Sequence, residues 1–271
     1  MERGNFLQKY GPWALVTGAS SGIGLEFARQ LAALGLNIVM VARRKSKLED
    51  LSNEIGQRHP SINTRIIVAD LSKKESIATT NEQTKDLDIG LLVNNAGVEI
   101  FGSFFNTRMD KHENCIAVNI SACVALTHLY GPRLMERRRG GIIFVSSMTK
   151  CALPYFSTYS GTKAFLSNLS LIVGHELKEY GVDVMSMEPG YVFSELSARV
   201  TEQIDLTKAG SFPMSAQKAV ALTLQEFPNR LYFTPGLFNR ILLAVSNFIP
   251  SGIFFTIMGF LMKNAMRTKR A

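Results

Sequence analysis

Residues 13–24 read WALVTGASSGIG, and this stretch decides the fold. The apolar run at 13–16 is typical of a buried strand, and helical spacing of apolar residues begins at Ile23. Gly18, Gly22 and Gly24 lie between the two. Glycines at this place let the chain turn sharply and let a pyrophosphate approach the main chain at the positive end of a helix. The stretch therefore predicts a dinucleotide cradle, although a tight turn can also use glycine for steric reasons alone.

The rest of the chain alternates in the same way. Short apolar runs predict further strands at 37–42, 64–69, 89–93, 141–145, 182–187 and 230–233. Helical patterns separate most of these runs, and the longest extend from near Lys111 to Arg137 and from Thr158 to Tyr180. This alternation predicts an α/β fold: a single Rossmann-type, doubly wound parallel sheet of about seven strands, with helices on both faces.

The end of the second predicted strand indicates which nucleotide binds. A carboxylate there would accept hydrogen bonds from the ribose and repel a 2′-phosphate. The sequence has Arg43 and Arg44 and no acid, and guanidinium groups suit a phosphate. We therefore predict NADP(H), with Arg43 as the first candidate and Arg44 as the second, against the alternative that they face solvent. Asp70 and Leu71 are placed to border the adenine, and Asp70 can equally cap a helix that begins at Ser72.

The candidate reacting groups follow later in the chain. Tyr159 and Lys163 lie four residues apart in a predicted helix, so their side chains share one face. A free phenol titrates near pH ~10, and a neighbouring ammonium group lowers its pKa. Ser146 and Ser147 end the fifth strand and offer a hydroxyl for a substrate oxygen. Asn119 is either a satisfied structural group or the holder of a water molecule in a proton path.

Composition narrows the other possibilities. The formal net charge of +8 favours anionic ligands, anionic lipid or nucleic acid. No recognition motif supports nucleic acid, so we expect no such partner. The three cysteines form no CxxC pair and have no histidine at ligand spacing, which predicts neither a disulfide framework nor a metal site. The first twelve residues are charged and contain no apolar run, so we expect no secretory signal and a cytoplasmic protein.

Six motifs occur in order along the chain: TGASSGIG at 17–24, Asp70-Leu71, NNAG at 94–97, Asn119, the serine pair, and Tyr159 with Lys163. Together with Pro189-Gly190, they resemble the short-chain dehydrogenase/reductase family over about residues 10–190. The segment 10–16 and the basic, apolar C-terminus are most similar to a bacterial branch of that family. That branch is related to the 17β-hydroxysteroid dehydrogenase and very-long-chain 3-ketoacyl reductase group.

The resemblance implies an NADP-dependent oxidoreductase that interconverts an apolar ketone or aldehyde and its alcohol. Tyr159 would be the general acid/base, Lys163 would lower its pKa and bind the nicotinamide ribose, and Asn119 would complete a proton relay through water. The residues expected to hold NADP(H) are Gly18, Ser20, Ser21, Gly22, Ile23, Gly24, Arg43, Arg44, Asp70, Leu71, Asn95, Ala96, Gly97, Tyr159, Lys163, Pro189, Gly190, Val192 and Ser194.

Either serine fits the catalytic position. Relatives usually place this serine thirteen residues before the tyrosine, a spacing that Ser146 keeps and that is one residue shorter for Ser147. We prefer Ser147, because the strand anchors it and the loop from Met148 to Pro154 can absorb a deletion. Phe101, Tyr155, Tyr191 and Phe193 are expected to line the substrate site, with core packing as the alternative.

We expect a catalytic domain over residues 1–235, with a lid at about 191–214, and an apolar, basic extension over 236–271. Residues 241–262 carry no charge and reach the length of a membrane span, but polar residues, a proline and glycines interrupt them. Two short helices are therefore expected. They could contact an anionic membrane, cover the substrate entrance or meet a partner subunit.

Several questions stay open at the level of the sequence. A homo-oligomer, dimer or tetramer, is expected through the long helices after the fourth and fifth strands. The substrate and the physiological direction are not determined. The rival interpretation is a catalytically silent NADP(H)-binding sensor or interaction protein at a membrane surface. The presence of Tyr159, Lys163 and Asn119 counts against it.

Overall fold

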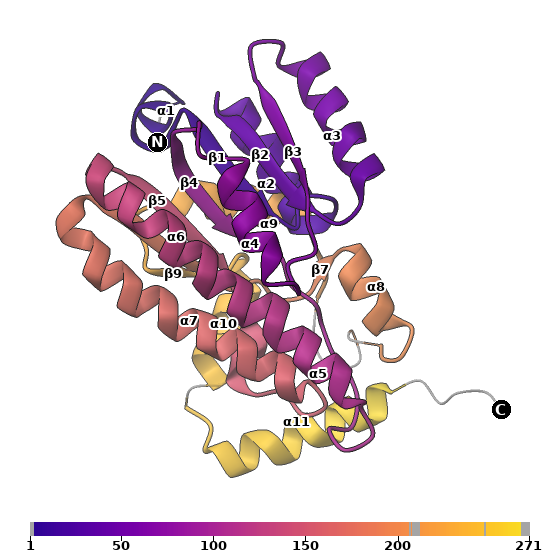
Figure 1. Cartoon of the computed structure of the whole chain (residues 1–271). Coiled ribbons are helices and arrows are strands. Elements are labelled where there is room, and N and C mark those ends of the chain that lie inside the picture. Colours follow the sequence, from indigo (N-terminus) through magenta and orange to yellow (C-terminus); the bar gives the residue numbers. More distant parts are fainter. Residues whose placement is uncertain (1–2, 206, 208–211, 247, 267–271) are drawn as a thin grey trace.

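The centre of the computed structural model is a seven-stranded parallel sheet with the strand order β3-β2-β1-β4-β5-β6-β9 (Figure 1). The strands are β1 (Trp13–Thr17), β2 (Asn37–Ala42), β3 (Thr64–Val68), β4 (Ile89–Asn94), β5 (Gly140–Val145), β6 (Val182–Met187) and β9 (Tyr232–Phe233). The structure describes residues 3–205, 207, 212–246 and 248–266. The direction of winding reverses between β1 and β4, which is where sheets of this type bind ligands. The predicted doubly wound fold is confirmed.

Helices cover both faces of this sheet (Figure 1). One face packs against α2 (Gly22–Ala33), α3 (Lys45–Arg58) and α9 (Ala216–Glu226); the other packs against α4 (Glu75–Glu82), α6 (Ala122–Arg137) and α7 (Ser157–Leu177). The short α1 (Arg3–Tyr10) packs with the first layer. Successive side chains of a strand point to opposite faces, so Ala14 and Val16 enter the first layer and Leu15 enters the second. This alternation explains why the strands are apolar throughout.

The long helix expected near 111–137 contains an irregular turn. It begins as α5 (Met109–Ile116), passes through one π-helical turn, η1 (Ala117–Ser121), and continues as α6. Asn119 lies in the π turn, a feature that occurs frequently at functional sites. By length and apolar composition Met109–Arg137 could cross a membrane, but half of its most apolar window is buried inside the protein. It packs on the sheet as a core helix.

The predicted lid begins and ends at a small second sheet. This sheet pairs β7 (Val192–Phe193) with β8 (Met214–Ser215), and α8 (Glu195–Thr201) follows β7. Residues 206 and 208–211 of the lid lie outside the described residues, so the closing motion stays a prediction. Two 3₁₀ turns complete the elements: η2 (Met148–Cys151) and η3 (Lys178–Tyr180).

The C-terminal extension forms two helices, as its interrupted apolar run predicts: α10 (Leu237–Ser246) and α11 (Ser251–Ala265). The inner side of α11 packs on the catalytic domain, where Met262 and Ala265 are buried in one cluster with Phe156 and Tyr159. The backbone N–H of Asp205 also donates to the carbonyl of Ala265 at 2.9 Å. A domain boundary at residue 235 stays a prediction, but the extension shares a core with the rest of the chain.

Candidate active site

The glycine-rich turn between β1 and α2 has the shape of a phosphate cradle. Gly18 and Gly22 have φ angles of 68° and 57°, a left-handed conformation that glycine adopts without steric cost. A Cβ on Gly24 would lie 2.3 Å from Asn95 Nδ2 and 2.4 Å from the Gly18 carbonyl oxygen. The turn is therefore packed against the end of β4. Asn95 fixes this packing, because its Nδ2 donates to the Thr17 carbonyl at 2.7 Å.

A cavity of about 680 Å³ extends from this turn past Tyr159 to the C-terminal helices. All of the residues expected to hold the dinucleotide line it except Gly24, which lies beneath the turn. A left-handed glycine turn at a helix N-terminus, with two arginines beside it, fits a ligand that carries phosphates. The sheet topology has brought these residues together from the ends of β1, β2, β3, β4 and β6.

The two arginines after β2 both line the cavity and are exposed. The guanidinium group of Arg44 is held over the cradle, since its Nη2 donates to Ser20 Oγ at 3.0 Å. Its Nη1 forms an ion pair with Glu195, the first residue of α8. The positive charge of Arg43 instead acts on Asp70. An anion at this end of the cavity would therefore meet two cations, of which Arg44 is held by Ser20 and Glu195.

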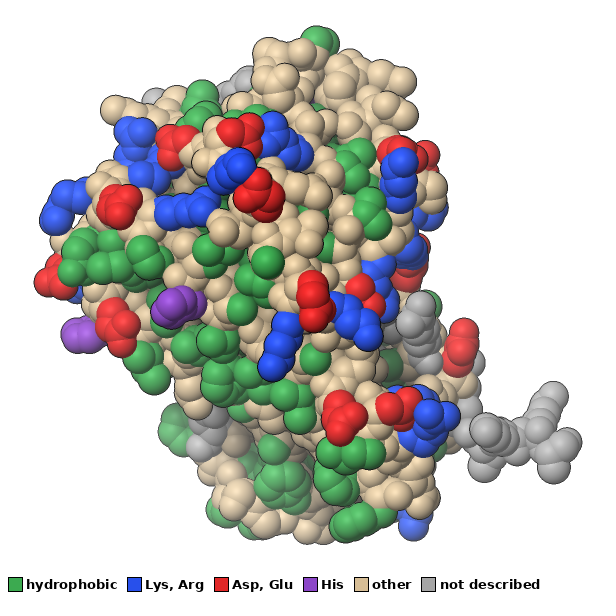
Figure 2. Space-filling model, viewed as in Figure 1, with side chains coloured by type: hydrophobic (Ala, Val, Ile, Leu, Met, Phe, Trp, Pro, Cys, Tyr) green, Lys and Arg blue, Asp and Glu red, His purple; other side chains and the backbone are tan. Residues whose placement is uncertain are grey.

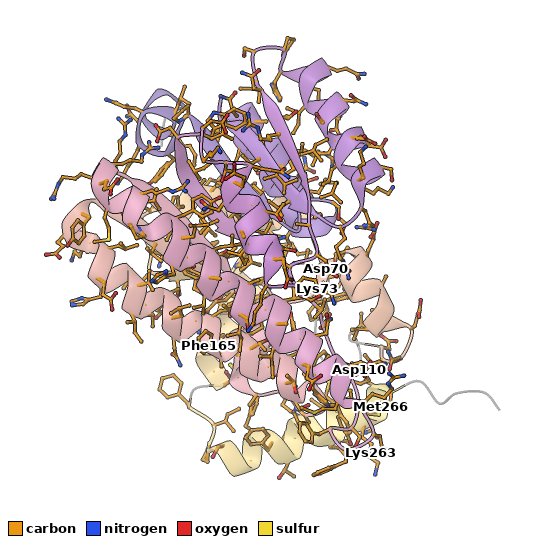
Figure 3. All side chains as sticks on the ribbon, in the orientation of Figure 1. Asp70, Lys73, Asp110, Phe165, Lys263 and Met266 are labelled. Carbon is orange, nitrogen blue, oxygen red and sulfur yellow. The ribbon has the colours of Figure 1, made fainter. Side chains whose placement is uncertain are left out.

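Asp70 has one of the two positions expected for it: it lines the cavity, but it does not cap a helix, because α4 begins at Glu75 with Lys74 as its N-cap. It borders the cavity, at the carboxyl end of β3 near Lys73 (Figure 3). Its Oδ1 also accepts hydrogen bonds from the backbone N–H and the hydroxyl of Ser72, at 3.1 and 2.9 Å. Burial acts to raise the pKa of Asp70, but these hydrogen bonds and the charges of Arg43 and Lys73 hold it below its ordinary value. The carboxylate is thus charged and fixed in position.

Tyr159 and Lys163 lie together at the centre of the cavity wall. Both are buried, and the Nζ of Lys163 is 5.6 Å from the centre of the Tyr159 ring. This Nζ donates a hydrogen bond to the carbonyl of Val145 at 2.7 Å. Burial lowers the pKa of Lys163 to about 8, although nearby acidic groups act to raise it. The helical spacing of the two residues has therefore produced the expected pair on one face of α7.

The electrostatics of this pair are dominated by burial. Burial raises the pKa of Tyr159 well above its ordinary value, and the negative charge of Glu99 raises it further. A hydrogen bond with Ser147 acts in the opposite direction. Desolvation of the phenolate and the nearby carboxylate dominate in the protein alone, and the lowering of the Tyr159 pKa by Lys163 stays a prediction. The protein alone thus keeps Tyr159 protonated at neutral pH.

Glu99 is a cavity residue that the sequence analysis did not single out. It lines the cavity after β4, and burial raises its pKa to about 7, although the Lys163 charge acts to lower it. It is coupled electrostatically to Tyr159, Lys163 and Cys115. A signal was present in the sequence, since an acid flanked by apolar residues directly after the NNAG motif lies at the carboxyl end of a predicted strand.

The two candidate serines face different neighbours. Ser146 is buried, and its hydroxyl donates to the Lys163 carbonyl at 2.6 Å and pairs with Ser167 Oγ at 2.8 Å. The Ser147 hydroxyl accepts from the Thr149 N–H at 3.1 Å and is also hydrogen-bonded to Tyr159. Ser146 thus supports α7 from below, and Ser147 faces the phenol.

Asn119 has a structural environment. It is fully buried, its Oδ1 accepts from the Val98 N–H at 2.8 Å, and its Nδ2 lies 3.0 Å from both the Val98 carbonyl and Thr162 Oγ1. Its side chain does not line the cavity. The amide holds the segment after NNAG against α7, and the relay role proposed from the resemblance stays a prediction.

The expected substrate residues are only partly brought to the cavity. Tyr191 lines it, and Phe101, Tyr155 and Phe193 do not. The ring of Phe101 packs against Tyr155 and Phe156, with centroids 6.2 and 5.1 Å away, so Phe101 is used in the local core. Phe193 lies on β7 with its side chain 58% exposed. Phe156, which was not among the expected substrate residues, lines the cavity instead of Phe101 and Tyr155.

The apolar end of the cavity is built largely by the C-terminal extension. Residues of α10 and α11 that line it include Phe238, Leu242, Phe254, Met258 and Met262. Sequence periodicity could not identify this role, because α11 is apolar on nearly all sides and so gives no preferred face. Among the described residues, no group of three or more His, Cys, Asp or Glu side chains could hold a metal ion.

Comparison with protein families places this site among known ones. The sequence profile described as "short chain dehydrogenase" matches residues 12–205. The very-long-chain 3-oxoacyl-CoA reductase of Ajellomyces capsulatus (strain NAm1 / WU24) is 39% identical over 202 residues, which cover 72% of this chain and 60% of that one. A protein of Homo sapiens named inactive hydroxysteroid dehydrogenase-like protein 1 is 36% identical over 200 residues, with 72% and 60% coverage. The match thus spans about 60% of the length of these relatives.

Solved structures share the fold over nearly the whole chain. One, from a study of 7β-hydroxysteroid dehydrogenase stereoselectivity, has a TM-score of 0.85 and 27% identity and covers 94% of this chain and 99% of that one. Another, a short-chain dehydrogenase from Sphingobium yanoikuyae in complex with NADPH, has a TM-score of 0.79 and 28% identity, with 96% and 98% coverage.

Proposed function

Because the chain belongs to the short-chain dehydrogenase/reductase family of oxidoreductases, in the group of the 17β-hydroxysteroid dehydrogenases and 3-ketoacyl reductases, we propose that it is an NADP(H)-dependent reductase of apolar carbonyl compounds. The observation that carries the proposal is one continuous cavity. It joins the glycine turn, the Arg43–Arg44 pair and the Tyr159–Lys163 pair to an apolar wall. The bacterial branch suggested by the sequence stays a prediction.

The proposed reaction adds a hydride to a carbonyl carbon and a proton to its oxygen. A bound nicotinamide supplies the hydride chemistry. Tyr159 Oη donates the proton to the developing alkoxide, and the hydroxyl of Ser147 donates a hydrogen bond to the same oxygen. Lys163, held by the Val145 carbonyl, positions the ribose side of the cofactor. The raised pKa of Tyr159 favours this reductive direction, because the phenol begins the reaction protonated.

NADP(H) is proposed over NAD(H) on the charge at the end of β2. Arg43 and Arg44 line the cavity there, and no acid follows the strand directly. A 2′-phosphate would meet both guanidinium groups, with Arg44 anchored by Ser20. The NADPH complex of the Sphingobium yanoikuyae dehydrogenase supports a nicotinamide cofactor of this kind.

The substrate is proposed to be a lipid-like or steroid-like carbonyl compound. Most of the side chains that α10 and α11 contribute to the cavity wall are apolar, with Asn239 and Ser246 as polar exceptions, which suits such a molecule. The relatives' names, a very-long-chain 3-oxoacyl-CoA reductase and hydroxysteroid dehydrogenase-like proteins, agree with this class. Cytoplasmic location and a homo-oligomer are also proposed. The outer face of α7 offers a contact surface for the latter, where Phe165 projects outward (Figure 3).

A catalytically silent NADP(H)-binding protein is the second candidate, since one relative is named inactive. The arrangement of Tyr159, Lys163 and Ser147 at one cavity wall favours an enzyme. Pure binding would not require a phenol with a hydrogen-bonded hydroxyl beside it.

Replacement of Tyr159 by Phe tests the proposal. We expect carbonyl reduction, followed by loss of NADPH absorbance, to fall by roughly 10²–10⁴-fold, while NADPH still binds. Tyr155→Phe is the matched control, because Tyr155 lies outside the cavity wall. Activity retained in Tyr159→Phe, or absent from the parent enzyme across a panel of apolar ketones, would refute the reductase.

A further inference from the structure

The outer side of α10 and α11 is an apolar surface. Five exposed side chains of the two helices and Phe248 from the turn between them form what we call the C-terminal apolar face; the five are Leu237, Ile241, Ile253, Phe255 and Phe260. Phe248 is 88% exposed and Phe260 is 66% exposed. Figure 2 shows hydrophobic side chains gathered at the end of the molecule formed by α11. A helix whose inner and outer sides are both apolar is typical of burial in protein or in lipid.

The cavity reaches the surface at this same place. Phe238, Leu242, Val245 and Ile257 all line the cavity, yet they are between 43% and 51% exposed. They therefore form its rim. All four rim residues are apolar, so the rim connects the apolar cavity wall to the C-terminal apolar face.

The charges on the segment that forms this face have one sign, although Asp205 from the rest of the chain lies beside the C-terminal end of α11. The sequence contains no Asp or Glu after Glu226, whereas six Lys and Arg residues occur in 227–271. Arg240 lies on α10, and Lys263 lies at the C-terminal end of α11 (Figure 3). A surface of this composition complements an apolar layer bordered by anionic groups.

This pattern distinguishes a bilayer from a second copy of the chain. A twofold-symmetric dimer would place the face against itself, and α10 and α11 carry no Asp or Glu that could pair with the partner's Arg240 and Lys263. Anionic headgroups supply the missing negative charge, and the acyl region accepts the Phe, Leu and Ile side chains.

We propose that the C-terminal apolar face docks peripherally on a bilayer that contains anionic lipid, with the cavity rim turned toward it. An apolar substrate then passes from the bilayer into the cavity without crossing water. Docking is independent of catalysis, and only the delivery of substrate rests on the proposed function.

The test is flotation of the full chain with vesicles of phosphatidylcholine alone or mixed with phosphatidylglycerol. The double variant Phe248→Glu/Phe260→Glu changes two exposed side chains that do not line the cavity. We expect the parent protein to bind the anionic vesicles, less so as salt rises. The variant should bind on the order of 100-fold more weakly, because two aromatic side chains that would enter the bilayer are lost and two negative charges are added. Ile172→Glu/Leu231→Glu adds the same charges at exposed apolar sites, 59% and 58% exposed, outside the C-terminal apolar face, and should bind normally.

Three results would overturn the docking proposal. The first is parent protein that stays unbound with both kinds of vesicle. The second is an equal loss of vesicle binding in the two double variants. The third is a dimer that Phe248→Glu/Phe260→Glu dissociates while vesicle binding is absent, which would assign the face to a second copy. Reduction of a water-soluble ketone, measured on the same samples, reports on the enzyme separately. Its absence would refute the reductase and leave the flotation result standing.

Discussion

The ammonium group of Lys163 lies 5.6 Å from the ring centre of Tyr159, yet it is hydrogen-bonded to the Val145 carbonyl 2.7 Å away. The cation is therefore held beside the ring by the end of β5. Both groups are buried, and burial disfavours the charged form of each. The result is a phenol with a raised pKa and an amine whose pKa is lowered to about 8. Glu99 is the third ionisable group of this cluster, and its negative charge acts to raise the pKa of both Tyr159 and Lys163.

Replacement of Glu99 by Gln should move the pH profile of alcohol oxidation. Ionised Glu99 raises the pKa of Tyr159, so its removal lowers the pH at which the phenol loses its proton. We expect the alkaline rise of kcat/KM for oxidation to shift down by roughly 1 pH unit. Glu195→Gln removes an acid from the other end of the same cavity and should leave the alkaline rise of kcat/KM at its original pH. An unchanged pH profile in Glu99→Gln would exclude an effect of the Glu99 charge on the pKa of Tyr159.

Glu99 also predicts a pH dependence of stability. Its pKa in the folded protein, about 7, lies above its ordinary value of 4.5, so the fold binds the proton more tightly than the unfolded chain does. Its favourable contribution is complete below pH 4.5 and is lost as the pH rises through 7. In Glu99→Gln this decline should be reduced by roughly 1–3 kcal/mol of unfolding free energy. Urea unfolding at several pH values from acid to alkaline measures it; parallel curves for parent and variant would contradict the assignment.

Replacement of the two serines should affect different properties: Ser147→Ala lowers turnover, and Ser146→Ala lowers stability. Ser147→Ala removes the hydroxyl beside Tyr159, so we expect kcat to fall by roughly 10²–10³-fold with NADPH affinity unchanged. Ser146→Ala removes the hydrogen bond to the Lys163 carbonyl and one partner of Ser167, which keeps its hydrogen bond to Glu188, and should cost about 0.5–1.5 kcal/mol of unfolding free energy. Steady-state kinetics and urea unfolding of both variants decide between them. The opposite pattern would make Ser146 the catalytic serine.

Local patterns in the sequence are sufficient to predict the sheet and the cradle. Strands such as β1 and β5 are short apolar runs that end at a glycine or at polar residues, and the parallel order follows from their alternation with helices. The carboxyl ends of parallel strands must meet at one edge, so the sequence alone predicts that residues as far apart as Gly18 and Tyr159 lie close together. The catalytic pair follows from helical spacing.

The electrostatics and the apolar wall depend on tertiary packing. The pKa of Tyr159 is raised by the burial of its ring and by the charge of Glu99, and neither the depth of burial nor the position of Glu99 follows from residue spacing in the sequence. Phe101 and Phe156 are the same residue type, but packing buries Phe156 fully and places it in the cavity wall, whereas Phe101 is partly buried against it and stays off the wall. A helix was expected from Ser72 only as the alternative role for Asp70, and α4 begins three residues later at Glu75. The helix α9 was not predicted, because its mixed sequence gives weak periodicity.

Cofactor preference should depend on the arginines after β2. Arg43→Ala and Arg44→Ala are each expected to weaken NADPH binding by roughly 10- to 100-fold, because each removes a charge-assisted contact to the 2′-phosphate. NADH binding should change little. Lys47→Ala is the matched control, since it removes one exposed positive charge close by that does not line the cavity. Dissociation constants from fluorescence titration give the answer, and equal losses for NADH and NADPH would remove the argument for NADP(H).

The last prediction concerns the cradle itself. A Cβ on Gly24 would lie 2.4 Å from the Gly18 carbonyl and 2.3 Å from the Asn95 amide, so Gly24→Ala must displace the turn or the end of β4. We expect dinucleotide binding to be lost and the unfolding free energy to fall by about 1–3 kcal/mol. Gly56→Ala is the control, because the position lies in α3 and a Cβ there meets nothing within 4 Å. That variant should be stabilised by roughly 0.5–1 kcal/mol. Thermal unfolding with and without NADPH separates the two effects, and a Gly24→Ala protein that NADPH stabilises as strongly as the parent would show that the close packing is not needed for binding.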